Sequence, residues 1–150
     1  MVYFLIIIGV FALDRFVKYL VSSGMNVGES IPLIDQIFHI TYIRNQGAAF
    51  SLLEGQQWIL IGLPLVVMVV GIVLLLLKHK VWHPMLNTSI AFICAGGIGN
   101  LIDRTFLGYV VDMFDFRVFP VFNVADIFVC VGCGLLLLYV LVFDKEKDEK

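Results

Sequence analysis

The chain has 150 residues, of which 61% are hydrophobic and 15% are charged; its formal net charge is −2 and its mean hydropathy is +1.00. This composition argues against a soluble globular domain, and the lack of a basic excess argues against nucleic acid or an anionic surface as a partner. We therefore expect a single polytopic membrane domain over residues 1–150, surrounded by membrane lipid.

The first membrane span is expected at residues 2–21. It begins as an apolar run, but it lacks the basic start and the small-residue cleavage site of a signal peptide. The run continues into Asp14, Arg15 and Lys18. Because Asp14 and Lys18 are four residues apart, they share a helix face and can pair near the outer end of the span, where a charge costs least. Two interpretations stay open: an ion pair that anchors the helix, or direct participation in a site.

Residues 22–57 are less hydrophobic and follow a different pattern. The segment QIFHITYIRN alternates in residue type after several glycine and proline breaks, which predicts a small sheet on the membrane surface. His39 lies in this strand and is interpreted as a surface histidine, not a metal ligand. Asn45 and Gly47 suit a turn, and residues 48–53 predict a short interfacial helix.

The second span is expected at residues 58–77, where twenty residues carry no charge. Lys78 and Lys80 follow it directly. Basic residues just after a span are typical of the cytoplasmic side, so this end is expected to face the cytoplasm.

The third span is expected at residues 85–103, where alanine and glycine recur every fourth residue. Small residues at this spacing allow close helix contact. Asn100 and Asp103 continue the same helix and are therefore expected to face other helices, not lipid. Arg104 can reach the interface or pair with an acid.

The segment before the fourth span is expected to be a loop exposed to water. It carries Asp112 and Asp115, and we interpret Asp115 as a solvated acid. Asn123 suits a helix N-cap, which places Asp126 in the first turn of the fourth span at residues 124–143. The positive end of the helix dipole favours a carboxylate at that position.

The three cysteines lie in apolar segments, Cys94 in one and Cys130 and Cys133 in another. No cation is near enough in the sequence to activate a thiol, so we interpret them as reduced packing residues. No set of side chains has the spacing of a metal site, and neither a metal nor a cofactor is expected.

Four spans place both chain ends on one side of the membrane. Five lysines after the second span and in the charged tail at residues 144–150 predict that this side is cytoplasmic. The polar residues that then meet at the outer face are Asp14, Asn45, Asn100, Asp103, Asp112, Asn123 and Asp126. Two carboxylates in a poorly hydrated site cannot both ionise easily, so one keeps its proton and the pair can act as acid and base. The pattern leads to the hypothesis of an intramembrane aspartyl hydrolase.

Five segments with the intervening spans carry a family resemblance: DRFVK at 14–18, RNQGAAF at 44–50, GNLIDR at 99–104, VVD at 110–112 and PVFNVAD at 120–126. The chain resembles the lipoprotein signal peptidases, or type II signal peptidases, over nearly its whole length. Arg15 stands where the family usually has glutamine and Met113 where it usually has phenylalanine. We expect both departures to affect packing only.

The resemblance implies an α-helical membrane protein with four transmembrane helices, and a small extracytoplasmic β-sheet and an interfacial helix between the first two. It implies a multi-pass aspartic protease of the bacterial cytoplasmic (inner) membrane, acting as a monomer near the extracytoplasmic face. Its substrates would be diacylglyceryl-modified prolipoproteins, cut just before the lipidated cysteine.

The resemblance also implies residue roles. Asp112 and Asp126 correspond to the catalytic dyad, one as general base on a water and the protonated partner as acid. The residues expected to shape the site and hold the substrate are Asn45, Gly47, Asn100, Asp103, Arg104, Asn123 and Ala125. Asp14 and Lys18 are expected to stabilise it.

Two alternatives come from other functional classes. A proton-conducting or transport subunit predicts polar residues through the depth of the bilayer, whereas here the second span has none. A structural membrane assembly subunit predicts that Asp112→Asn is tolerated, because Asn keeps the size and hydrogen bonding of Asp but cannot act as a base.

Overall fold

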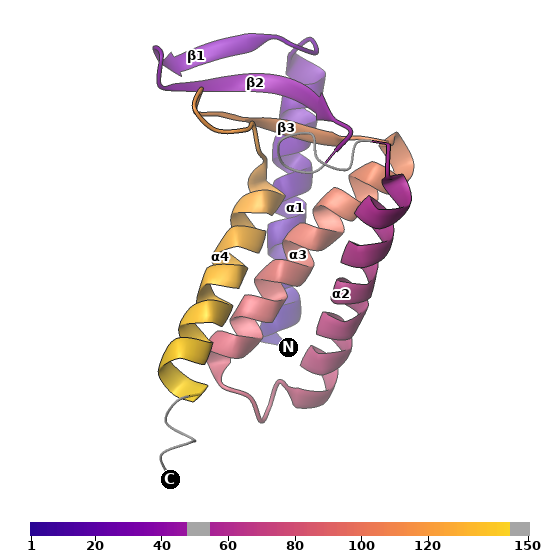
Figure 1. Cartoon of the computed structure of the whole chain (residues 1–150), viewed down its shortest axis with the longest axis vertical. Coiled ribbons are helices and arrows are strands. Elements are labelled where there is room, and N and C mark those ends of the chain that lie inside the picture. The colour runs from indigo at the N-terminus through magenta and orange to yellow at the C-terminus, as the bar shows by residue number, and fades with distance from the viewer. Residues whose placement is uncertain (48–54, 145–150) are drawn as a thin grey trace.

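The computed structural model describes residues 1–47 and 55–144, in which four long helices support one small sheet (Figure 1). The elements in chain order are α1 (Val2–Gly24), β1 (Ser30–Ile34), β2 (Phe38–Asn45), α2 (Gln57–Lys78), α3 (Pro84–Leu107), β3 (Val110–Asp115), α4 (Val124–Tyr139) and a π-helical continuation, η2 (Val140–Asp144). The sheet lies across one end of the helices, and the start of α1 and the end of α4 lie towards the other. The predicted interfacial helix at residues 48–53 and the tail from residue 145 fall outside the described residues.

Three of the described helices are long and apolar enough to cross a membrane: Gln57–Lys78, Pro84–Leu107 and Val124–Phe143. They coincide with the predicted second, third and fourth spans. Helix α1 has 23 residues, which corresponds to about 35 Å at about 1.5 Å per residue. It has the length of a span, but Asp14, Arg15 and Lys18 interrupt its apolar sequence.

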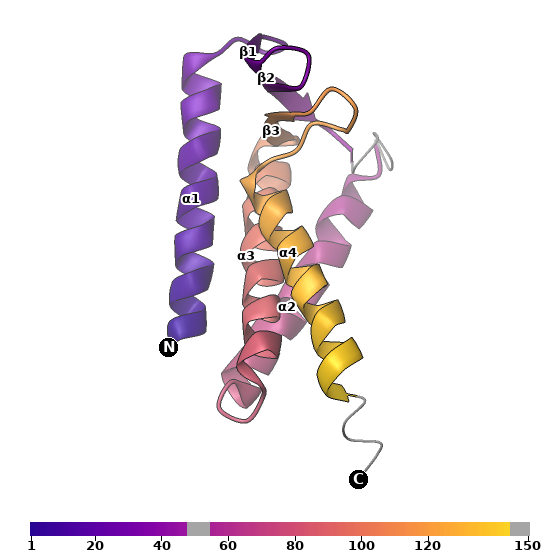
Figure 2. The ribbon, with the colours of Figure 1, turned by 90° about the vertical axis from the view of Figure 1, so that its left-hand side faces the viewer.

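Helix α3 lies at the centre of the bundle and packs against α1, α2 and α4 (Figure 2). Its predicted small residues are buried, namely Ala91, Ala95, Gly96 and Gly99. A Cβ on Gly96 would meet the Ala125 carbonyl oxygen and Val129 of α4, and one on Gly99 would lie 2.6 Å from Asp14 Oδ2. The predicted close contact is confirmed. It brings the first turn of α4 and the charged part of α1 against α3.

The sheet corrects one expectation from the sequence. The predicted strand is β2, but its neighbour β3 comes from the segment that we expected to be a loop exposed to water. The sequence VVDMFD alternates only weakly between apolar and polar residues because both faces of this strand are covered. All its residues except Phe114 are buried. The antiparallel register pairs Ile43 with Asp112 and Asn45 with Val110. Asp112 therefore lies on a strand beside the end of β2.

Asp115, expected to be a solvated acid, is buried at the end of β3. Its Oδ2 accepts hydrogen bonds from the Thr41 hydroxyl at 2.8 Å and Arg117 Nη1 at 3.1 Å, and its Oδ1 accepts from the Arg117 backbone N–H at 2.8 Å. Burial disfavours the charged form, but these hydrogen bonds hold the pKa of Asp115 below its usual value. The expectation is wrong because pairing with β2 encloses the carboxylate.

The contact between α3 and α4 yields a stability prediction. We expect Gly96→Ala to lower the free energy of unfolding by about 1–3 kcal/mol, because the new methyl group forces the helices apart. Thermal unfolding in detergent measures the effect. Gly134→Ala on α4 is the matched control, since its Cβ would meet nothing within 4 Å. Equal midpoints for the two variants would contradict the prediction.

Candidate active site

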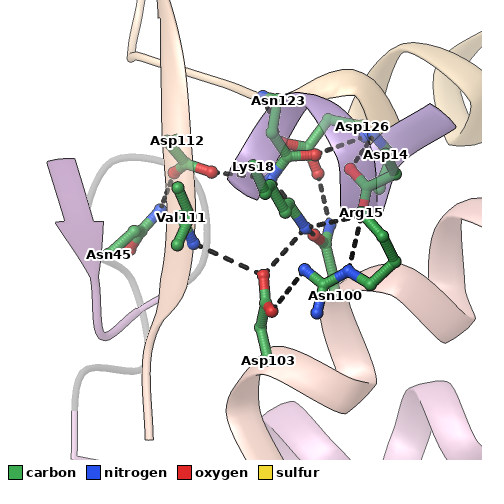
Figure 3. Close-up of polar contacts among 11 residues, drawn as sticks. Asp14, Arg15, Lys18, Asn45, Asn100, Asp103, Val111, Asp112, Asn123 and Asp126 are labelled. Atoms are coloured by element: carbon green, nitrogen blue, oxygen red, sulfur yellow. Dashed lines mark hydrogen bonds and ion pairs between the residues drawn. The ribbon is translucent and has the colours of Figure 1, made fainter. Parts of the chain in front are cut away.

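A cavity of about 210 Å³ lies where the sheet meets the helices, and both Asp112 and Asp126 line it. Asn45, Asn100 and Arg104 contribute the other polar parts of its wall. These five residues come from β2, α3, β3 and α4, so the cavity forms where these four elements meet. The polar residues predicted to meet at the outer face lie together in the structure (Figure 3): Asp14, Asn45, Asn100, Asp103, Asp112, Asn123 and Asp126.

Asp112 is 2% exposed and lies on β3 between the side chains of two asparagines. Asn45 Nδ2 donates to its Oδ2 at 2.9 Å, and Asn123 Nδ2 donates to its Oδ1 at 2.6 Å. Burial raises the pKa of Asp112 to about 6; the charge of Asp126 acts in the same direction, and the two amide donors oppose the shift. The carboxyl is therefore able to hold a proton at mildly acidic pH.

Asp126 lies in the first turn of α4, as the predicted N-cap requires. Asn123 Oδ1 accepts from the Asp126 N–H at 3.0 Å, and Asp126 Oδ2 accepts from the Asn123 N–H at 3.1 Å, which together form a capping box. Asn100 Nδ2 donates to Asp126 Oδ1 at 2.7 Å. Asn123 thus contacts both carboxylates, one through its side chain and one through its backbone.

The hydrogen-bond network fixes which end of each asparagine amide faces the carboxylates. The Gly47 N–H donates to Asn45 Oδ1 at 2.9 Å, and Lys18 Nζ donates to Asn100 Oδ1 at 2.9 Å. The Asp126 N–H holds Asn123 Oδ1 in the same way. Because each amide oxygen is occupied by a donor, each NH₂ group turns towards Asp112 or Asp126.

A cluster of charged side chains lies behind the cavity. Lys18 Nζ is 2.9 Å from Asp14 Oδ2 and 2.8 Å from Asp103 Oδ2, which confirms the predicted pair and adds a third partner. Asp14 Oδ1 accepts from the Ala125 N–H at 3.0 Å, so Ala125 contributes its backbone. Arg15 Nη2 lies 2.6 Å from Asp103 Oδ1. The expectation that Arg15 affects packing only is wrong, because Arg15 forms an ion pair with Asp103, a residue expected to shape the site. The two residues are 88 positions apart in the chain.

Arg104 and two apolar cavities complete the surroundings. Arg104 Nη2 donates to the Gly47 carbonyl at 3.0 Å, which ties α3 to the end of β2. A cavity of about 400 Å³ between α2, α3 and α4 is lined by Arg104 and Asp126 together with side chains such as Leu63 and Met68. Another, of about 300 Å³, extends along α4 past Phe122 and Cys130 and also reaches Asp126.

Two features of this site have no signal in the sequence. The apolar cavities form between elements distant in the chain, and Cys130, interpreted only as a packing residue, lines two cavity walls. His39 does not line these cavities; its Nδ1 lies 3.1 Å from the Ser30 hydroxyl. Within residues 1–47 and 55–144, no three His, Cys, Asp or Glu side chains gather as metal ligands would.

Comparison with known proteins assigns this arrangement to a family. Residues 6–142 match the family described as signal peptidase (SPase) II. The chain is 45% identical over 146 residues to a lipoprotein signal peptidase of Brevibacillus brevis, covering 96% of this chain and 97% of that protein. It is 45% identical over 148 residues to that of Clostridioides difficile, covering 97% and 99%.

The fold is similar to solved bacterial membrane enzymes. One of them superposes with a TM-score of 0.90 at 29% identity, covering 99% of this chain and 93% of the solved one. A second gives 0.84 at 29% identity, with coverage of 95% and 94%. Because the family match and these relatives extend over nearly the whole chain, the protein belongs to the signal peptidase II family and is a peptidase.

Proposed function

We propose that the protein is an aspartyl endopeptidase that removes the signal peptide from diacylglyceryl-modified prolipoproteins, cutting before the lipidated cysteine. One observation carries the proposal: Asp112 and Asp126 line one cavity at the end of the helix bundle, and Asn123 hydrogen-bonds to both. Family membership supports the substrate class, since the curated relatives are lipoprotein signal peptidases. The proposal includes a monomeric enzyme, as the resemblance implies.

The protein spans the cytoplasmic membrane of a bacterium four times in this proposal, with α1 as the remaining span. Leu5, Ile8 and Phe16 are exposed along α1 and suit contact with lipid. The charges of α1 lie at its sheet end, where Asp14 and Lys18 are buried against α3 and paired. Pairing offsets the cost of burying them.

The orientation follows from the lysines. Lys78 ends α2 and Lys80 follows it, at the side where α1 begins and α4 ends. The tail at residues 144–150 adds more lysines in the sequence. By the positive-inside rule this side is cytoplasmic. The sheet and the cavity then face the extracytoplasmic side, where a lipid-anchored substrate arrives within the outer leaflet.

The dyad works as an acid and a base in this scheme. Asp112, whose pKa is raised to about 6 by burial, carries the shared proton, and Asp126 is the ionised base. Asp126 takes a proton from water while the water oxygen attacks the scissile carbonyl carbon, and Asp112 gives its proton to the carbonyl oxygen. When the C–N bond breaks, the leaving amine takes the proton from Asp126 and the hydroxyl returns one to Asp112.

The remaining site residues hold the dyad and the substrate. Asn45, Asn100 and Asn123 direct N–H groups at the carboxylates and keep them in place. Arg104 lies on the walls of the polar cavity and the larger apolar one, which suits a contact with the substrate backbone. The two apolar cavities adjoin Asp126 and offer room for the aliphatic parts of the substrate.

The first test replaces each aspartate of the dyad. We expect Asp112→Asn and Asp126→Asn to lower kcat by about 10²- to 10⁴-fold or more, because Asn neither accepts nor returns the proton. The measurement is cleavage of a purified diacylglyceryl-modified prolipoprotein in detergent, with thermal unfolding to verify folding. Asp35→Asn, an exposed turn position, is the matched control.

The outcomes separate the candidate functions. A folded Asp112→Asn variant near the wild-type rate would make Asp112 structural, as an assembly subunit requires. A wild-type protein that leaves the lipidated substrate intact would favour the transport or assembly functions instead.

The second test follows the proton on Asp112. Because the protonated carboxyl is the acid, we expect kcat/KM to fall as the pH rises through an apparent pKa of about 6. Initial rates at low substrate concentration across the pH range measure this limb. A flat profile through this region would contradict the assignment of the proton to Asp112.

A further inference from the structure

Two buried carboxylates outside the proposed dyad each hold the backbone just before one of its members. Asp14 Oδ1 accepts from the Ala125 N–H at 3.0 Å, and Ala125 immediately precedes Asp126. Asp103 Oδ2 accepts from the Val111 N–H at 3.4 Å, and Val111 immediately precedes Asp112. Strand β3 and helix α4 are thus held by equivalent contacts from α3 and α1 (Figure 3).

Lys18 joins these two carboxylates. Its Nζ lies 2.9 Å from Asp14 Oδ2 and 2.8 Å from Asp103 Oδ2. Its third contact is Asn100 Oδ1 at 2.9 Å, and Asn100 donates in turn to Asp126. The contact with Asn100 is a hydrogen bond, the contacts with the two carboxylates are close ion pairs, and the side chain is 3% exposed. One buried atom therefore connects α1 to the supports of both aspartates.

Resting on the proposed function, we propose that Lys18 is a positioning residue that sets the relative placement of Asp112 and Asp126 from behind the cavity. Asn123 joins the two aspartates directly on the cavity side. A backbone bridge between Phe114 and Phe122 also ties β3 to the residue before Asn123. Lys18 supplies a connection from the opposite side of the cavity, through Asp14 and Ala125 on one side and through Asp103 and Val111 on the other. β3 and α4 are therefore held together from both sides of the dyad.

Charge balance alone does not account for this arrangement. Asp14 and Asp103 carry two negative charges, and Lys18 and Arg15 carry two positive charges. Arg15 contacts Asp103 at 2.6 Å but lies 3.8 Å from Asp14, and its side chain is 30% exposed. Lys18 reaches both carboxylates and the Asn100 amide at hydrogen-bond distance. Its geometry, and not only its charge, is suited to the connection.

The influence of Lys18 also extends to the dyad through space. Its positive charge lowers the pKa of Asp112 and so opposes the upward shift that burial causes. The charged groups that face Lys18 are Asp14 and Arg15 on its own helix, Asp103 on α3, and Asp112 on β3. A change at Lys18 is therefore expected to alter the pH profile as well as the rate.

The experiment compares two variants that keep the cluster electrically neutral. Lys18→Arg keeps the charge, but a longer, planar guanidinium does not place a single nitrogen close to the same three oxygens. Lys18→Met combined with Asp103→Asn removes one charge of each sign. If Lys18 positions the dyad, kcat falls by about 10²-fold in both while KM changes little, since a displacement of about 1 Å has this effect on rate.

The readouts separate positioning from stability. Cleavage of the lipidated prolipoprotein gives kcat and KM across pH, and thermal unfolding gives the folded fraction. We expect the two apparent pKa values of the kcat profile to move relative to each other, because their coupling depends on the distance between the aspartates. Lys78→Arg, an exposed lysine at the far end of α2, is the matched control.

Each outcome decides the proposal. Near wild-type kcat and an unchanged pH profile in either folded neutral variant would overturn it and leave Lys18 as a balancing charge. If the double variant does not fold, Lys18→Arg decides; if neither folds, Lys18 is a requirement of the fold and the proposal fails. Activity in Asp112→Asn or Asp126→Asn would overturn the proposed dyad itself, whatever the Lys18 variants do.

Discussion

The cost of burying charge in an apolar helix bundle governs this structure. Asp14, Asp103 and Asp112 are almost fully buried, and an unpaired carboxylate in such a place costs several kcal/mol even after the surroundings relax. Ion pairs with Lys18 and Arg15 offset that cost for Asp14 and Asp103. Asp112 receives only neutral amide donors, which leaves it with a raised pKa and a proton to exchange. The same bundle thus pairs two buried acids with cations and leaves a third, Asp112, with a raised pKa.

Close packing makes this division possible. Gly96 and Gly99 on α3 let the first turn of α4 and the charged part of α1 approach. The N-terminus of α4 then presents Asp126 to the cavity while the N–H of Ala125 turns towards Asp14. A larger residue at either glycine would separate the buried cluster from the dyad. The small-residue repeat, which in many membrane proteins serves helix association alone, here also determines the geometry of the site.

Much of this arrangement follows from local sequence patterns, and the rest depends on long-range pairing. Hydropathy and length predict four spans, three of which coincide with helices long and apolar enough to cross a membrane. Short-range rules predict the cap by Asn123 and the pairing of Asp14 with Lys18. The strand β3 is not predictable in this way, because its residues are covered on both faces and do not alternate clearly. The contact of Arg15 with Asp103 joins positions 88 residues apart, and no local pattern encodes it. The segments shared with the signal peptidases identify the candidate residues but not the contacts that orient them.

The proposed mechanism requires that the two aspartates share one proton and that Asp112 carries it. Infrared spectroscopy of the protein in detergent tests this directly, because a protonated carboxyl has a C=O band distinct from that of a carboxylate. We predict a carboxylic acid band that disappears with a midpoint near pH 6, is absent in Asp112→Asn, and titrates at lower pH in Asp126→Asn, where the neighbouring charge is gone. A band that persists unchanged in Asp112→Asn would contradict it.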